Sequence, residues 1–129
     1  MMHCVKVGGV HFGGDKLPII AGPCVIESRD HALNMAESIA EITNSLDLPF
    51  VFKSSFDKAN RTSVKSFRGL GMEQGLDILG EIKATVGVPI LTDVHNPDQA
   101  AVVAGVVDVF LDPRNPWWCL VFGVPFHDS

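Results

Sequence analysis

The sequence has few of the features that mark membrane or secreted proteins. Its longest apolar run, residues 100–107, falls well short of the roughly 18 residues that a membrane-spanning helix needs. The first residues lack the apolar core and cleavage pattern of a secretory signal. The three cysteines, Cys4, Cys24 and Cys119, form no C-x-x-C pair, which disfavours a disulfide framework or a zinc module. We therefore expect a cytoplasmic protein without membrane contacts.

Positive charge is also scarce, and half of it is concentrated in one stretch. The chain holds 10 Lys and Arg against 15 Asp and Glu, so its formal net charge is -5, which disfavours general nucleic-acid binding. Five of the cations lie within residues 53–71 beside a single acid, Asp57. Ser, Thr, Asn and Gly separate these cations, and this composition suits a compact anion such as a phosphorylated metabolite. A solvated basic loop is the alternative interpretation.

The apolar pattern predicts an N-terminal hairpin followed by alternating strands and helices. Residues 3–16 alternate apolar and polar side chains around a Gly-Gly pair, as two short strands and a turn would. Short buried strands are expected at 17–21, 49–52, 89–91 and 106–111. Helices are expected after Ser28, over 72–86 and after Asn96, with Ser28 and Asn96 as N-caps. This order is typical of a parallel sheet with helical crossovers.

Residues able to do chemistry follow three of the predicted strands. Cys24 follows the first, Lys53 the second, and Asp93 and His95 the third. Because ligands of parallel α/β folds bind at the carboxyl ends of the strands, we expect these side chains to share one site. After the fourth strand the pattern breaks, since residues 112–118 contain two prolines and two adjacent tryptophans. One more short strand is expected within 119–124.

Four motifs stand out between residues 20 and 95. They are I-A-G-P-C-V-I-E-S at 20–28, F-K-S-S-F-D-K-A-N-R-T-S at 52–63, S-F-R-G at 66–69 and T-D-V-H at 92–95. Together they resemble the family of 3-deoxy-manno-octulosonate-8-phosphate synthase, also called 2-dehydro-3-deoxyphosphooctonate aldolase. D-K-A-N-R-T is the most specific of the motifs. Leu70 and Asn96 depart from the family pattern, which usually has proline and an acid at these positions.

The resemblance implies a (β/α)8 barrel, the TIM-barrel fold, with an N-terminal hairpin closing its bottom. Such a barrel takes roughly 250 residues, and this chain supplies about four βα units. We therefore expect an α/β protein built as a single partial TIM-barrel domain, with a hairpin at 1–16, βα units at 17–111 and a divergent tail at 112–129. Residues 107–115 and 124–129 resemble a late-barrel segment, as a lost middle section would produce. A frameshifted end is the alternative.

The resemblance also implies an activity. Members of the family condense phosphoenolpyruvate with arabinose 5-phosphate in lipopolysaccharide biosynthesis, releasing phosphate as the carbon–carbon bond forms. Their basic loop reaches into a neighbouring subunit, so a homo-oligomer is expected. The implied catalytic residues are Lys53, Lys58, Asp93 and His95. The implied substrate-binding residues are Ser55, Lys58, Asn60, Arg61, Thr62 and Arg68. The alternatives are surface charges for the lysines and a hydrogen-bonded strand end for Asp93 and His95.

A divalent metal ion is the one cofactor that the resemblance suggests. Cys24 occupies the position at which metal-dependent members carry a ligand, and a thiolate suits such an ion. If the tail corresponds to the late-barrel segment, His127 would be a further ligand. The alternative for Cys24 is a small, buried apolar residue.

Three other functions remain open from the sequence. The seven-carbon sugar-phosphate aldolases of aromatic biosynthesis share a similar loop but read K-P-R-T where this chain has K-A-N-R-T at 58–62. An inactive half-barrel fragment or interaction module would expose open sheet edges that favour association. A phosphate-binding protein would use the basic stretch without chemistry.

Overall fold

The computed structural model describes residues 5–57, 69–111 and 120–121. Near the N-terminus, β1 (Val5–Val7) and β2 (Val10–Phe12) form an antiparallel hairpin. Gly8 turns the chain there at φ +58°, and a Cβ on it would lie 2.9 Å from the Pro89 ring. The predicted hairpin is confirmed, and its turn lies against the residue that precedes β5.

Among the described residues, five strands form the main sheet in sequence order. The first four are parallel: β3 (Ile19–Ala21), β4 (Phe50–Lys53), β5 (Ile90–Asp93) and β6 (Val109–Leu111). The fifth, β7 (Leu120–Val121), pairs antiparallel with β6. The predicted parallel βα order is therefore confirmed through β6, and β7 departs from the parallel order of the preceding strands.

Three helices connect the parallel strands: α1 (Arg29–Ser45), α2 (Met72–Val86) and α3 (Pro97–Ala104). The Ser28 hydroxyl accepts a hydrogen bond from the His31 amide at 3.1 Å, which confirms the predicted N-cap. Asn96 caps α3 in the same way, with Pro97 in its first turn. Gly87 ends α2 in the left-handed conformation at φ +76°. None of the described helices is long and apolar enough to cross a membrane.

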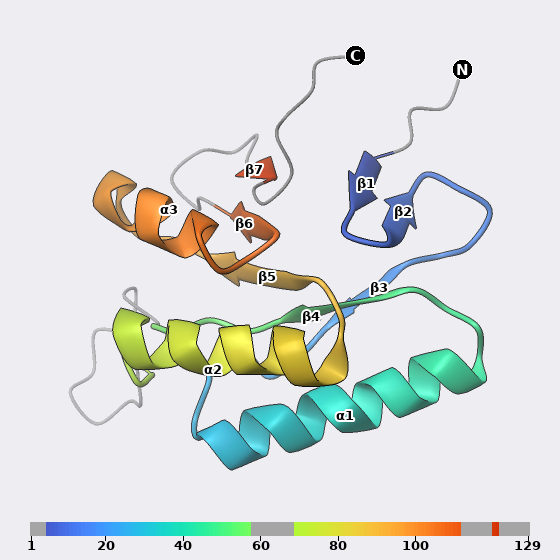
Figure 1. Ribbon diagram of the computed structural model, residues 1–129, viewed down its shortest axis with the longest axis horizontal. Coiled ribbons are helices and arrows are strands. Elements are labelled where there is room, and N and C mark those ends of the chain that lie inside the picture. Colours follow the sequence, from blue (N-terminus) through green and yellow to red (C-terminus); the bar gives the residue numbers. More distant parts are fainter. Residues whose placement is uncertain (1–4, 58–68, 112–119, 122–129) are drawn as a thin grey trace.

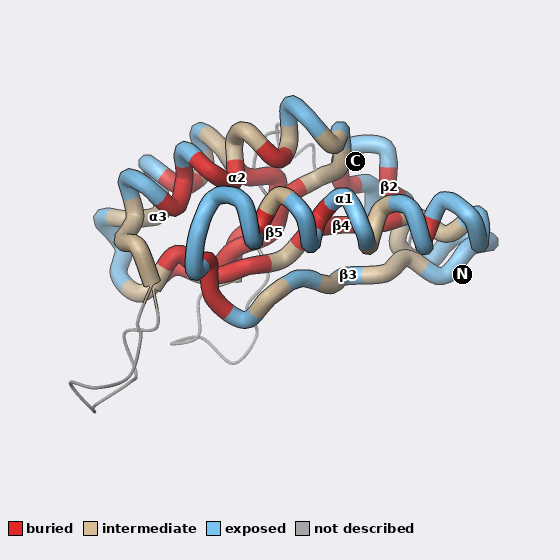
Figure 2. The backbone as a smooth tube through the Cα atoms, turned by 90° about the horizontal axis from the view of Figure 1, so that it is seen from below, coloured by how far each residue is buried: buried red, intermediate tan, exposed pale blue. Residues whose placement is uncertain are grey.

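The two faces of the sheet are buried by different elements. Helices α1 and α2 lie side by side along one face, and the hairpin lies on the other (Figure 1). Alternate residues of each strand take opposite sides: Phe50 and Phe52 join the helix-facing core, whereas Val51 packs with the hairpin valines Val7 and Val10. Buried segments follow β4, β5 and the helix sides that face them (Figure 2). This layering matches one part of a barrel wall.

On the hairpin side, the sheet is only partly covered. A cavity of about 270 Å³ opens there, and every residue that lines it is apolar: Val5, Val7, Phe12, Ile20, Val51, Leu91 and Val109. In the described part of the chain β3 forms one edge of the sheet, since it pairs with β4 alone. Of the residues that line this cavity, Ile20 on the edge strand and Val5 on the hairpin are exposed, whereas Val51, Leu91 and Val109 of the inner strands are buried.

Candidate functional site

Two of the predicted catalytic residues lie at neighbouring strand ends. Lys53 is the last residue of β4 and Asp93 the last of β5. Lys53 follows Val51 by two residues, and Asp93 follows Leu91 by two, so both share the face on which the hairpin packs. We call this hairpin-covered face the inner face. The cation and the carboxylate therefore occupy its carboxyl end, where a parallel sheet binds its ligands.

A chain of buried hydroxyl groups fastens the strand ends to one another. The Thr92 Oγ1 donates to the Ser54 carbonyl oxygen at 2.7 Å, and the Ser54 Oγ donates to the Pro23 carbonyl oxygen at 2.7 Å. The next amide, that of Ser55, donates to the Cys24 carbonyl oxygen at 3.3 Å. These bonds run from β5 across the end of β4 to the segment after β3, so they fix the backbone on which the candidate residues stand.

Gly22 allows this close approach. A Cβ on Gly22 would lie only 1.9 Å from the Lys53 carbonyl oxygen, so any side chain would push the G-P-C segment away from β4. Sequence reasoning singled out Cys24 and Lys53 but missed Gly22, Ser54 and Thr92. The available signal was the presence of small or hydroxyl-bearing residues where each apolar run ends.

His95 contacts the start of the basic stretch. Its Nε2 lies 2.7 Å from the Asp57 carbonyl oxygen and 4.0 Å from the Asp93 Oδ2. Its ring meets the Phe56 ring edge to face, with centroids 6.0 Å apart. The other carboxylate oxygen, Asp93 Oδ1, is buried with no hydrogen-bond partner among the described residues. The site thus contains a buried acceptor beside an imidazole.

The remaining predicted residues divide into two groups. Ser55 is described and buried, with 1% of its surface exposed, and it forms a parallel bridge with Val25. Six lie outside the described residues: Lys58, Asn60, Arg61, Thr62, Arg68 and His127. Their roles stay predictions.

Cys24 is a free and exposed thiol. This finding corrects the alternative interpretation of Cys24 as a buried apolar residue, since the G-P-C turn carries it to the surface. Within the described ranges, no group of three His, Cys, Asp or Glu side chains is placed to hold a metal ion. The described residues therefore do not make a metal site by themselves, and the metal role of Cys24 stays a prediction.

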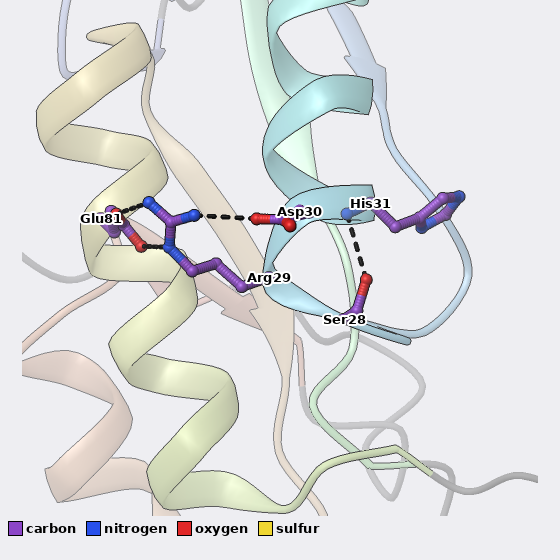
Figure 3. Close-up of polar contacts among 5 residues, drawn as sticks. All are labelled: Ser28, Arg29, Asp30, His31 and Glu81. Carbon is purple, nitrogen blue, oxygen red and sulfur yellow. Dashed lines mark hydrogen bonds and ion pairs between the residues drawn. The ribbon is translucent and has the colours of Figure 1, made fainter.

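A forked ion pair joins the two helices near the same end of the sheet. Figure 3 shows the Arg29 guanidinium between the Glu81 carboxylate of α2 and Asp30, with the Ser28 cap beside them. The Arg29 Nε donates to Glu81 Oε2 at 2.7 Å, and Nη2 contacts Oε1. The hydrogen bond from Arg29 lowers the pKa of Glu81, and the same bond raises the pKa of Arg29. This pair holds α1 to α2.

Comparison with known proteins agrees with this geometry. The family model described as "DAHP synthetase I family" matches residues 3–111. The chain belongs to the DAHP synthetase I family. This match covers the hairpin, the four parallel strands and all three helices, and it stops where the predicted divergent tail begins. The expectation of a barrel-type α/β fold is thereby confirmed.

Curated relatives within this family are named 2-dehydro-3-deoxyphosphooctonate aldolase. The protein from Koribacter versatilis is 50% identical over 113 residues, which cover 88% of this chain and 41% of the relative. Those from Cupriavidus taiwanensis and a Synechococcus species are 56% identical over 110 residues, covering 84% of this chain and 38% and 39% of the relatives. The predicted resemblance to this enzyme type is confirmed. The chain spans about two fifths of the length of the relatives it matches.

Proposed function

We propose that this chain forms the substrate-binding first half of a 2-dehydro-3-deoxyphosphooctonate aldolase. The reaction condenses phosphoenolpyruvate with arabinose 5-phosphate to give 3-deoxy-manno-octulosonate 8-phosphate and phosphate. The observation that carries the proposal is the identity of 50–56% to relatives with this name across the strands that bear Lys53 and Asp93. The names of these relatives favour the eight-carbon product over the seven-carbon alternative.

The chemistry requires two anions to be held together. A carbon–carbon bond forms between the terminal carbon of the enol phosphate and the sugar aldehyde, water adds to the adjacent carbon, and phosphate leaves with cleavage of its bond to that carbon. Lys53, at the inner mouth of β4, offsets the charge of phosphoenolpyruvate. Lys58, Asn60, Arg61 and Thr62 bind the sugar phosphate, with Arg61 through a forked contact. Ser55 and Arg68 complete substrate binding in this proposal.

Asp93 takes part through its carboxylate. Its buried Oδ1 has no hydrogen-bond partner among the described residues, and an unsatisfied buried acceptor gains free energy when a donor reaches it. A hydroxyl group of the sugar supplies such a donor. Asp93 therefore orients the sugar at the mouth of β5, the strand beside the one that ends at Lys53.

The 129-residue polypeptide binds sugar phosphate but does not turn over, because the described part of its sheet supplies four parallel strands of a fold that uses eight. The test combines calorimetric titration of arabinose 5-phosphate with an assay of phosphate release from phosphoenolpyruvate. Saturable binding that Arg61→Ala abolishes, with Lys6→Ala on the hairpin as the matched control, is expected. Unchanged binding by Arg61→Ala would refute the assignment of the sugar-phosphate site. Turnover that chelation abolishes would refute the expected inactivity.

A divalent metal ion is the cofactor we propose, bound through the exposed thiol of Cys24. When bound, such an ion would supply electrostatic stabilisation near the aldehyde. Cys24→Asn removes the sulfur ligand but keeps a polar side chain. Titration with Mn²⁺ should therefore show weaker binding by this variant than by the parent chain, and equal binding would exclude Cys24 as a ligand.

Self-association is a second proposed property, and a specific observation favours it. Ile20 on edge strand β3 lines the apolar cavity, and Ile42 on α1 and Leu46 at its C-cap are exposed. Apolar surface of this kind favours burial against another copy. We propose that the protein is a homo-oligomer in the cytoplasm.

A further inference from the structure

His95 lies where the end of β5 meets the start of the basic stretch. Its Nε2 is 2.7 Å from the carbonyl oxygen of Asp57. Because a carbonyl oxygen can only accept, Nε2 carries the hydrogen and donates it. Asp57 is the first residue of the D-K-A-N-R-T motif, and Lys58 follows it. The imidazole is therefore bonded to the backbone from which the motif departs.

The backbone and ring of His95 are held from other directions as well. The His95 amide donates to Gln99 Oε1 at 2.8 Å, and the Gln99 amide donates to Asn96 Oδ1 at 3.1 Å. This reciprocal arrangement is a variant of the capping box at the start of α3. The His95 ring makes a T-shaped contact with Phe56, and its side chain is only 15% exposed. The imidazole thus has a fixed place before any ligand binds.

The far end of the basic stretch returns to the same point. The Gly71 amide donates to the Phe56 carbonyl oxygen at 3.2 Å. Gly69, at φ +122°, passes so close that a Cβ on it would lie 2.3 Å from that oxygen. Residues 56–57 and 69–71 therefore lie together, and the His95 side chain bonds to them from the segment that follows β5.

We propose that His95 is a positioning residue for the basic stretch and not a general acid or base. Its Nε2–H holds the Asp57 carbonyl, and this bond fixes the backbone from which the D-K-A-N-R-T motif continues relative to the end of β5. At 4.0 Å from Nε2, the Asp93 Oδ2 lies beyond hydrogen-bond distance of the ring. The carboxylate therefore stays available to substrate. This inference rests on the proposed sugar-phosphate site.

The experiment compares three replacements of His95 by titration with arabinose 5-phosphate. His95→Gln keeps an N–H donor at about the reach of Nε2, His95→Asn has a donor that falls short of it, and His95→Leu has none. We expect roughly tenfold weaker binding for the Asn and Leu variants, as loss of one positioning hydrogen bond implies. The Gln variant should bind within about twofold of the parent chain. His31→Leu, on the exposed surface of α1, is the matched control.

Other outcomes would overturn the inference. Equal weakening by all three variants would mean that the imidazole itself is required, and unchanged binding by all three would mean that the bond to Asp57 positions nothing. If His95→Leu does not fold, the comparison of Gln with Asn decides, because both side chains are polar amides.

If the parent chain does not bind arabinose 5-phosphate, the proposed function fails, but the role of His95 can still be tested by hydrogen exchange. His95→Asn should then speed exchange at the Gly71 amide, which bonds to Phe56. Exchange at this amide should stay unchanged in His95→Gln, and exchange at the α1 amides should stay unchanged in both variants. Equal exchange at Gly71 in both variants would refute the positioning role independently of the ligand.

Discussion

The hydroxyl of Thr92 donates a 2.7 Å hydrogen bond to the backbone carbonyl of Ser54. Both residues are fully buried, and the bond crosses from β5 to the residue directly after β4. Ser54 in turn bonds to the Pro23 carbonyl through its own hydroxyl. The strand ends that carry Lys53 and Asp93 are thus linked by fully buried side chains.

Thr92→Val should destabilise the fold. The substitution keeps the shape of the side chain but leaves the buried Ser54 carbonyl without this donor, at a cost of about 1–3 kcal/mol. Urea unfolding followed by circular dichroism measures the change. Ser45→Ala is the control, since the Ser45 hydroxyl also bonds to a carbonyl but on the exposed end of α1. A cost for Thr92→Val no larger than that of the control would show that the bond contributes little.

Gly22→Ala should destabilise the fold severely. The added Cβ would lie 1.9 Å from the Lys53 carbonyl oxygen, a backbone atom that cannot rotate away. We expect a loss of more than about 3 kcal/mol, as for other severe backbone clashes. Gly9→Ala is the matched control, because nothing lies within 4 Å of the Cβ built there. Equal unfolding midpoints for the two variants would contradict this account.

The sequence predicted those elements whose signals are local. The caps at Ser28 and Asn96 and the span of α2 are confirmed, because a capping side chain or a left-handed glycine acts within a few residues. The start of β6 was predicted too early. Val106 and Val107 donate back to the Val103 carbonyl and prolong the turn after α3, so the strand begins at Val109.

Features that depend on where the sheet ends could not be read from periodicity. Leu46 follows the buried Thr43 by three residues, so its spacing would place it on the buried face of α1, yet it is 62% exposed, since it is the C-cap and lies beyond the core that the helix covers. The hydroxyl chain from Thr92 to Pro23 was missed for a related reason. Its members come from three segments, and only the strand register brings them together.

The pair of Arg29 and Glu81 should make stability depend on acid pH. Because Arg29 lowers the pKa of Glu81 in the folded protein, the pair stabilises the fold above the ordinary pKa of a glutamate. This stabilisation is lost as the pH falls through the lowered value. Between about pH 7 and about pH 3, the urea midpoint of the parent chain should therefore fall further than that of Glu81→Gln. The urea midpoint of Glu41→Gln, a change on the exposed face of α1, should fall as much as that of the parent chain. Parallel pH profiles of the midpoint for the parent and Glu81→Gln would argue against the linkage.

Charge on the exposed side of α1 should weaken self-association. Ile42 and Leu46 are 59% and 62% exposed, and both are apolar. Ile42→Glu would place a carboxylate on the surface proposed to contact another copy, where it would lose hydration on burial. Sedimentation velocity should show a smaller species for this variant. Asn34→Glu adds the same charge to an exposed polar position of α1 and should leave the distribution unchanged; a monomeric parent chain would rule out the oligomer itself.

Asp108 should matter more to stability than its ion-pair partner. Its buried carboxylate accepts from the Ile90 amide at 2.9 Å and from the Lys83 Nζ at 3.0 Å, which links β5 and α2 to the residue before β6. Asp108→Ala leaves the buried Ile90 amide without this acceptor and should cost about 2–3 kcal/mol, as for bonds to a charged group.

Lys83→Met should cost less than Asp108→Ala. It keeps the apolar stem of a side chain that is 42% exposed, and water then reaches the carboxylate, so we expect about 1 kcal/mol or less. Urea unfolding of both variants gives the order. A larger loss of stability for Lys83→Met would show that the ion pair, and not the bond to the Ile90 amide, is the main contact of the Asp108 carboxylate.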